Sequence, residues 1–321
     1  MPGSHPAISI VLPVYNEEQC LPALLARLTA VLAGLTGDYE LIFVDGASTD
    51  GSFPILERAS AQHREVKCVS LSRNSGHQAA LTCGLQLAQG EVVITMDAAL
   101  QHPPELIPAM LALWEQGNDV VNTAKHAPPD ASLWKRVSAD WFYRLYNLIS
   151  DVRVTAHSSD FRLLDRRCVD AINEMGEHFK FHRALVQYIG FRQTVLEFQC
   201  PPRFAGKAKF SFRRLLALAA DGIFSFSTLP LKLPFYLGTL VLAIFFLLFL
   251  VAFGLVVTGH LDLPPGWGYL FTGIVLTFAV QLIFIGIVGL YIARIFHEVK
   301  RRPHHFVARS CGFAALATGR R

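Results

Sequence analysis

The sequence predicts an α/β domain built on a mostly parallel sheet, followed by a C-terminal part that crosses a membrane twice. Three observations lead to this prediction. Short apolar, β-branched runs alternate with helical segments up to Thr123. Two later stretches, residues 233–260 and 263–293, contain no Asp, Glu, Lys or Arg. Basic residues flank these stretches, whereas the short loop between them has none.

The clearest element of the α/β part is Val92–Met96, an apolar run that predicts a buried strand. The run ends in Asp97, and the residues 102–105 (HPPE) predict a turn followed by a helix, because proline suits the first helical position. An acidic residue at the carboxyl end of a buried strand lies where open α/β sheets bind ligands. The sequence therefore predicts a ligand site at this edge.

The other elements of the first domain follow from the same alternation. Pro13 closes the first apolar run, and Gly34 and Gly37 mark the end of the helix after it. The remaining strands are expected at Ile8–Val14, Glu40–Asp45, Val66–Leu71 and Asp119–Thr123. The helices are expected at Leu21–Leu35, Phe53–Gln62, His77–Ala88 and Pro104–Gln116.

The alternation weakens after Thr123, so the elements there are less regular. The amphipathic segment Phe212–Phe226 directly precedes an uncharged stretch, and such a helix lies along the membrane surface. The other expected elements are a polar loop at Lys125–Asp130, an aromatic-rich helix at Trp134–Ser150, a turn and short strand at Ser158–Asp165, a helix at Arg166–Met175 and a basic loop at Cys200–Ser211.

Each uncharged stretch can supply the roughly 20 apolar residues that a membrane-spanning helix needs. The alternative, two buried helices of a soluble core, is disfavoured by their length and purity. By the positive-inside rule, the segments on both sides of the two spans are expected in the cytoplasm. The membrane that the spans cross is expected to be the inner (plasma) membrane of the cell. The flanking basic residues are Arg213, Arg214 and Lys232 before the spans, and Arg294, Lys300, Arg301 and Arg302 after them.

The amino-acid composition further limits the class of protein to which this chain can belong. Hydrophobic residues make up 52% of the chain and charged residues only 17%, which is unusual for a soluble enzyme. The net charge of +4 reflects the flanks of the spans, and nothing indicates nucleic acid. The N-terminus has no basic region followed by an apolar one, so we expect no signal peptide. The six cysteines have no CxxC spacing and are expected to be free thiols.

Six short motifs follow one another along the chain: PVYNEE (13–18), VDGASTDG (44–51), RNSGHQAAL (73–81), DAALQHPPE (97–105), DFRLLDRR (160–167) and RFAGKAKFS (203–211). Each motif alone is weak, and their order makes the combination specific. In this order and followed by two uncharged stretches, they resemble the family 2 glycosyltransferases that load sugars onto polyprenyl phosphate. Relatives in that family include dolichyl-phosphate mannose synthases, bactoprenol glucosyltransferases and the aminoarabinose transferase of lipid A modification.

This resemblance implies a GT-A fold, a nucleotide diphosphate sugar donor, a divalent metal (Mg²⁺ or Mn²⁺), a lipid phosphate acceptor and inversion of the anomeric centre. It also implies a homo-oligomer, a tetramer in relatives. The expected division is a cytoplasmic GT-A domain over residues 1–210, an interfacial helix over 211–228, two transmembrane helices over 229–296 and a basic cytoplasmic tail over 297–321. For the donor, the resemblance implies that Pro13, Tyr15, Asn16 and Glu17 line the nucleotide pocket and that Asp45 contacts the base or ribose.

For the chemistry, the resemblance implies that Asp97 and Gln101 lie at the diphosphate and the metal. It implies that Asp160 and Arg162 face the reacting sugar and phosphate. The lipid phosphate candidates are basic, and the alternative for them is a surface patch that attracts anionic lipid. They are Arg203, Lys207 and Lys209, with Arg136 as a weaker one.

The chain departs from the family pattern at three places. Gly46 stands where the family has a second acidic residue, and Ala99 removes the second carboxylate of the DxD motif. Residues 206–210 are GKAKF where the family has GESKY. Losing the second DxD carboxylate removes a hard oxygen ligand. Either Asp97, Gln101, water and the diphosphate hold the metal, or the metal is weak, or activity is low.

The individual residues also have ordinary structural explanations. Asp97 lies too far upstream to cap the helix at Pro104, whereas Asp45 also fits simple turn chemistry. Asp160 fits an N-cap or a partner of Arg162 as well as it fits a catalytic role. Lone histidines at helix starts, as at His77 and His102, are usually structural, and no His/Cys cluster has zinc spacing.

Two functions are therefore compared. The first is a membrane-bound transferase that moves a sugar from a UDP-sugar, with a GDP-sugar second, to undecaprenyl or another polyprenyl phosphate in cell-envelope synthesis. The second is a catalytically weakened relative that binds nucleotide or lipid phosphate, or that scaffolds a glycosylation complex. A processive polysaccharide synthase is disfavoured, because two spans are few for a channel and no QxxRW segment is present.

Overall fold

A computed structural model describes residues 7–35, 37–126, 158–177, 180–199, 266–300 and 302–313, together with scattered positions between 236 and 258. The chain divides into two compact units. One comprises Met1–Leu148, Val152–Leu216 and Arg302–Arg321, and the other Ile149–Asp151 and Ala217–Arg301. The predicted helices at Trp134–Ser150 and Phe212–Phe226 and the basic loop at Cys200–Ser211 lie outside the described residues.

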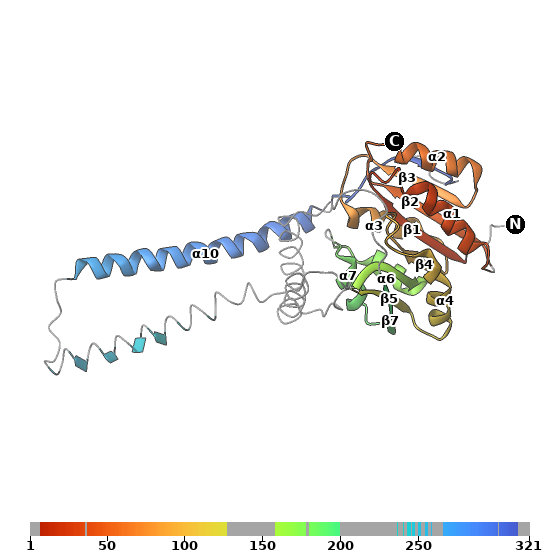
Figure 1. Ribbon diagram of the computed structural model, residues 1–321. Coiled ribbons are helices and arrows are strands. Elements are labelled where there is room, and N and C mark those ends of the chain that lie inside the picture. The colour runs from red at the N-terminus through yellow and green to blue at the C-terminus, as the bar shows by residue number, and fades with distance from the viewer. Residues whose placement is uncertain are drawn as a thin grey trace. The chain divides into compact units, whose positions relative to one another are not determined.

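The described strands of the first unit form one eight-stranded sheet in the order β7-β5-β6-β4-β1-β2-β3-β8 (Figure 1). Strand β1 pairs in parallel with β2 and β4, β2 with β3, and β5 with β7, whereas β6 and β8 run antiparallel to their neighbours. The expected α/β fold with a mostly parallel sheet is confirmed. The strands are β1 Ile8–Val14, β2 Tyr39–Asp45, β3 Val66–Leu71, β4 Val92–Thr95, β5 Val120–His126, β6 Ser158–Asp165, β7 Gln193–Gln199 and β8 Val307–Cys311.

Helices cover both faces of this sheet. Each of the helices α1 and α4 has a proline in its first turn, where a missing backbone N–H costs nothing. A 3₁₀ turn, η1 at Pro104–Leu106, leads into α4. The helices of this unit are α1 Leu21–Leu32, α2 Ser52–Gln62, α3 His77–Leu87, α4 Ile107–Glu115, α6 Arg166–Glu174 and α7 His182–Tyr188.

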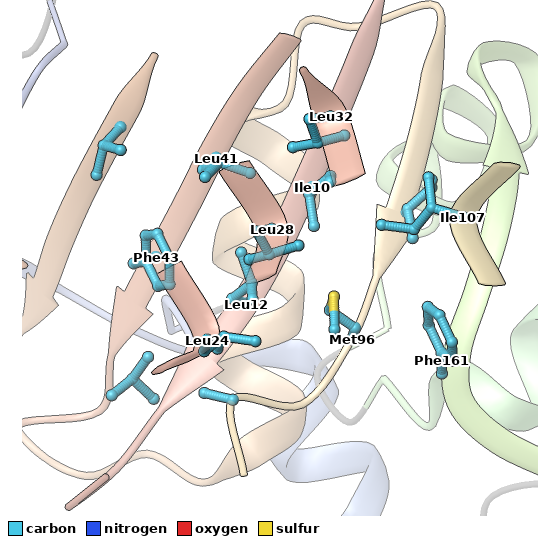
Figure 2. Packing of buried hydrophobic residues seen from close by; sticks show 14 of the residues in the cluster. Ile10, Leu12, Leu24, Leu28, Leu32, Leu41, Phe43, Met96, Ile107 and Phe161 are labelled. Atoms are coloured by element: carbon cyan, nitrogen blue, oxygen red, sulfur yellow. The ribbon is translucent and has the colours of Figure 1, made fainter. Parts of the chain in front are cut away.

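The main core lies between α1 and the sheet. Leucines spaced three and four residues apart along α1 share one face, and they are all fully buried. Figure 2 shows Leu24 and Leu28 lying over side chains of β1 and β2 such as Leu12 and Phe43. Burying each such side chain contributes about 2 kcal/mol, so this layer fixes β1 and β2 firmly.

The opposite face of the sheet carries α3, which approaches very closely. A Cβ atom added at Gly84 in α3 would come within 2.2 Å of Val11 Cγ1 in β1, so only glycine fits there. Helix α3 begins at His77, one residue after Gly76, whose φ of +90° favours glycine. The close packing at Gly84 therefore places the start of α3 at the carboxyl end of the central strands.

A buried charged group joins the strands at their amino ends. Glu40 at the start of β2 is 2% exposed, and its carboxylate accepts hydrogen bonds from Ser9 Oγ and from the backbone N–H of Gln89. Lys67 Nζ lies 2.6 Å from the other carboxylate oxygen. We call Ser9, Glu40, Lys67 and Gln89 the amino-end cluster, and it connects β1, β2, β3 and the residues before β4.

Several elements differ from those expected. Strand β5 continues to His126 rather than Thr123, and Ser158–Asp165 forms a full strand that lies between β4 and β5. The sequence predicts no helix or strand within residues 176–199, yet they contain α7 and the edge strand β7. A strand was also not expected within 297–321, where β8 pairs with β3.

The second unit contains one long described helix, α10, at Trp267–Val299 (Figure 1). Over the residues that the structure describes, no helix combines the length and apolarity that crossing a membrane requires. The two membrane-spanning helices therefore stay a prediction from the sequence.

Candidate active site

Three loops meet at the carboxyl ends of the central strands, following β1, β2 and β4. Each contains a non-glycine residue with positive φ, and these are the ones that the described chain contains: Asn16 at 52°, Ala47 at 60° and Leu100 at 57°. Such conformations cost about 1 kcal/mol or more and cluster at functional sites. This edge is therefore the candidate active site on backbone geometry as well as on sequence.

Hydrogen bonds join the first two loops to each other. The backbone N–H of Asn16 donates to Ser48 Oγ at 2.9 Å, and the backbone N–H of Thr49 donates back to Asn16 Oδ1 at 2.8 Å. Glu18 accepts a hydrogen bond from the backbone N–H of Gly51 at 2.7 Å. The motifs 13–18 and 44–51, which are far apart in sequence, thus form one surface.

The predicted donor-binding residues all lie on or beside this surface. Pro13 is buried within β1, and Tyr15 at the end of the strand is 37% exposed. The backbone N–H of Glu17 donates to Ser52 Oγ at 2.9 Å. The assignment of these residues to a nucleotide pocket stays a prediction.

Asp45 occupies the end of β2 but points into the protein. Its side chain is nearly fully buried, and it accepts hydrogen bonds from Ser70 Oγ at 2.8 Å and from the backbone N–H of Ser48 at 3.1 Å. The carboxylate thus anchors the loop after β2. Because the carboxylate is 1% exposed, the expected contact of Asp45 with a base or ribose stays a prediction.

The loop after β4 is shaped by His102. The backbone N–H of Asp97 donates to His102 Nδ1 at 2.8 Å, so the ring proton lies on Nε2, which contacts Ser159 Oγ at 2.7 Å. The ring stacks on Phe161 with a centroid distance of 5.2 Å. Burial lowers the pKa of His102 to about 4, so it is neutral at physiological pH. His102 is a structural residue, as expected.

This loop presents Asp97 at the edge of the sheet. The Asp97 side chain is 33% exposed, which leaves it accessible to a ligand. Burial alone would raise the pKa of Asp97, but the neighbouring His102 and His77 bring it below its ordinary value. Gln101 belongs to the same loop and is partly exposed. Asp97 is therefore an available anion at neutral pH.

Asp160 enters the same site from β6, and it is held by two arginines. Arg183 of α7 donates to both carboxylate oxygens at 3.0 and 2.8 Å, and Arg162 Nη2 lies 3.4 Å from Oδ1. Although burial opposes it, Arg183 and the nearby His77 hold the pKa of Asp160 well below its ordinary value. Burial lowers the pKa of Arg162 to about 10, which leaves it cationic.

His77 lies between these two carboxylates. Its Nε2 is 3.6 Å from Asp97 Oδ1 and 3.6 Å from Asp160 Oδ2. Burial lowers the pKa of His77, but the Asp160 and Asp97 carboxylates outweigh that effect and raise it above its ordinary value. The sequence predicts a structural role for His77 and does not single out Arg183, because the partners of both residues are distant along the chain. We call His77, Asp97, Asp160 and Arg183 the carboxyl-end cluster.

The donor set for a divalent cation is small. Within the described ranges, no group of three His, Cys, Asp or Glu side chains is arranged to hold a metal ion. Asp160 is engaged by arginines, and Ala99 is 8% exposed at the position where the second DxD carboxylate would be. Asp97 alone still fits Mg²⁺, which commonly binds one or two carboxylates and keeps waters and substrate phosphates as its other ligands.

The basic residues predicted for the lipid phosphate are outside the described part of the chain. They are Arg136, Arg203, Lys207 and Lys209, so the geometry of the acceptor side stays a prediction.

Comparison with known proteins shows which sequences this chain is similar to. The model of the family "Glycosyl transferase family 2" matches residues 9–172. An uncharacterized glycosyltransferase of Synechocystis is 38% identical over 96% of this chain and 97% of its own length. The SfII prophage-derived bactoprenol glucosyl transferase of Shigella flexneri is 35% identical over 94% of this chain and 98% of its own. The prophage bactoprenol glucosyl transferase homolog of Escherichia coli is 33% identical over 94% and 98%.

Among solved structures, a mannosyltransferase of Pyrobaculum calidifontis in complex with GDP-Man and Mn²⁺ has a TM-score of 0.45 and 16% identity, covering 94% of this chain and 88% of that chain. The TarS fragment of S. aureus in complex with UDP-GlcNAc has a TM-score of 0.41 and 17% identity, covering 68% and 67%.

Proposed function

The chain belongs to glycosyltransferase family 2 and is an enzyme, and from this premise we propose that it transfers a sugar from a nucleotide diphosphate sugar to a polyprenyl phosphate. The observation that carries the proposal is the similarity over nearly the whole length to bactoprenol glucosyl transferases. We take a UDP-sugar as the first donor to test and a GDP-sugar as the second.

The carboxyl-end cluster supports a direct displacement. An oxygen of the acceptor phosphate forms a bond to the anomeric carbon while the bond from that carbon to the diphosphate oxygen breaks, with inversion. A phosphate monoester has a second pKa of about 6 and is already largely dianionic at neutral pH. The acceptor therefore needs no general base, which agrees with the low pKa that the arginine contacts give Asp160.

The residues of the candidate active site each have a part in this proposed reaction. Asp97 would hold a divalent cation, which would neutralise charge that develops on the leaving diphosphate. Asp160 pairs with Arg183 and Arg162, and these two arginines balance its negative charge. The joined loops after β1 and β2 would receive the nucleotide, with Asp45 at their base.

We also propose that residues 229–296 anchor the enzyme in the inner membrane with the catalytic domain in the cytoplasm. The support is the absence of charged residues from 233–260 and 263–293 and the position of the flanking basic residues. Anchoring would place a soluble donor and a lipid acceptor at one surface. Retention in the membrane pellet after alkaline carbonate washing would agree with an integral anchor, and release would contradict it.

The function is tested by a donor screen. Purified full-length protein is incubated with polyprenyl phosphate, Mg²⁺ or Mn²⁺ and a panel of UDP- and GDP-sugars, and lipid-linked sugar is measured. One donor should give product, and a chelator should abolish it if the metal is required. Product from no donor would contradict the proposal, and calorimetric binding of a sugar nucleotide without turnover would favour a weakened binding protein.

A further inference from the structure

The position of His77 sets an upper limit on the separation of the two site carboxylates. Because Nε2 of this residue is 3.6 Å from one oxygen of Asp97 and 3.6 Å from one oxygen of Asp160, those two oxygens are at most twice that distance apart. The imidazole side chain is 36% exposed, so it forms part of the accessible surface of the site. One ring nitrogen thus contacts both carboxylates at once.

The two carboxylates differ in their support. Asp160 is held by the two-pronged contact with Arg183, whereas Asp97 lies beside two histidines. One of these, His102, is neutral and uses both ring nitrogens for the loop and for Ser159. His77 is therefore the group that links Asp97 to the arginine-bound Asp160. Without it, two like charges would face each other at short range.

The start of α3 is itself held in place, which gives His77 a fixed position. The neighbouring side chain of Gln78 accepts a hydrogen bond from the backbone N–H of His182 at 3.1 Å. One turn later, Thr82 Oγ1 lies 2.9 Å from His182 Nε2. His182 opens α7, the helix that also carries Arg183. The histidine and the arginine that contact the carboxylates therefore come from two helices that are bonded to each other.

We propose that His77 is a positioning residue, which bridges Asp97 and Asp160 and holds them at the spacing that sugar transfer requires. This rests on the proposed function of the site, which it deepens by adding a residue outside the acidic motifs. The charged groups that face His77 are Asp97 on the loop after β4, Asp160 on β6 and Arg183 on α7. A bridge of this kind acts through the carboxylates and needs no contact with substrate.

The kinetic test compares three variants of the full-length protein. His77→Ala removes the bridge, and His77→Gln keeps an N–H donor at similar reach. His63→Ala is the matched control, since His63 also pairs with a carboxylate, Glu65 at 3.5 Å, but lies after α2 at the amino end of β3. We expect kcat to fall about 10- to 100-fold in His77→Ala, with the KM for the donor changed less than about 3-fold. His77→Gln should recover to within about 3-fold of wild type, and His63→Ala should match wild type.

The outcomes separate the two proposals. A wild-type protein that transfers no sugar contradicts the proposed function. An active wild type with His77→Ala equal to His63→Ala overturns the role of His77, as does a loss that His77→Gln fails to recover. A crystal structure of His77→Ala gives an answer independent of activity. The Asp97 and Asp160 carboxylates should be further apart than in wild type, and unchanged positions would overturn the proposal.

Discussion

The sheet has a charged cluster at each end, and the two clusters differ in how completely they are satisfied. In the amino-end cluster, one carboxylate, Glu40, is 2% exposed and meets the donors of Ser9, Gln89 and Lys67. In the carboxyl-end cluster, two carboxylates share the site, and Asp97 is 33% exposed. The first is closed to ligands, whereas the second keeps acceptor capacity at the surface.

This difference separates a structural group from a candidate site better than residue type does. Both clusters combine an acid with a basic side chain, and both join elements that are distant in sequence. Only the carboxyl-end cluster is accompanied by positive φ values in all three neighbouring loops. The predictions below test whether one end of the sheet carries the activity and the other the stability.

The largest effect is expected at the open carboxylate. Asp97→Ala should lower kcat by about 100- to 1,000-fold, because it removes the charge that would hold the metal and diphosphate. Unfolding temperature should change little, since the structural hydrogen bond of this residue comes from its backbone N–H. Lipid-linked sugar formation and thermal unfolding measure the two effects. Full activity in this variant would exclude Asp97 as the metal ligand.

In the amino-end cluster we expect a loss of stability without a loss of activity. Glu40→Ala should lower the free energy of unfolding by about 3 kcal/mol, because Lys67, Ser9 and the N–H of Gln89 lose their shared acceptor. The kcat of the folded fraction should stay at the wild-type value. Denaturant unfolding and kinetics on the same preparation test this. A large loss of kcat without loss of stability would break the comparison.

An intermediate effect on stability is expected when Asp160 is replaced, and this effect should depend on pH. Its pKa is depressed in the folded state, so the stability that it contributes is complete above its unfolded pKa of about 3.9 and is lost as pH falls through the lower folded value. Asp160→Asn should therefore be less stable than wild type by about 2 kcal/mol at pH 7, and the gap should narrow in acid. Urea unfolding at several pH values measures it, and a gap independent of pH would contradict it.

The smallest effect is expected on the surface. Arg27 and Glu105 form a two-pronged ion pair, but their side chains are 38% and 53% exposed. Glu105→Gln should lower the free energy of unfolding by less than about 1 kcal/mol and leave kcat unchanged. The change should shrink further in high salt. A loss comparable to that of Glu40→Ala would show that exposure is a poor guide to these clusters.

The central strands could be predicted from the sequence because their signal is local. Ile8–Val14 and Val66–Leu71 have the predicted bounds, since apolar runs are closed by turn residues on both sides. The edge strands gave a weaker signal. In β7 the sequence QTVLEFQ is only half-buried, and β8 is a five-residue strand whose partner lies more than 230 positions earlier in the chain.

The site was predictable where a residue ends a strand and unpredictable where residues meet through space. Asp97 follows the apolar run of β4 directly, so its location was evident. The sequence predicts a structural role for His77, since nothing near it in sequence shows that β6 brings Asp160 to its ring. The partner of Asp160 was expected to be Arg162, but Arg183 makes the closer contact from α7, a helix that was not anticipated.

The position of β8 has a consequence for how the enzyme is made. Strand β3 is covered on its outer side by β8, which follows α10 in the chain and is therefore synthesised after it. The outer edge of β3 therefore stays unpaired in the nascent chain until β8 has been synthesised. A premature stop before Val307 would leave this edge of β3 unpaired permanently. Unpaired strand edges can pair with other chains, so truncated copies should aggregate rather than persist as shorter active enzymes.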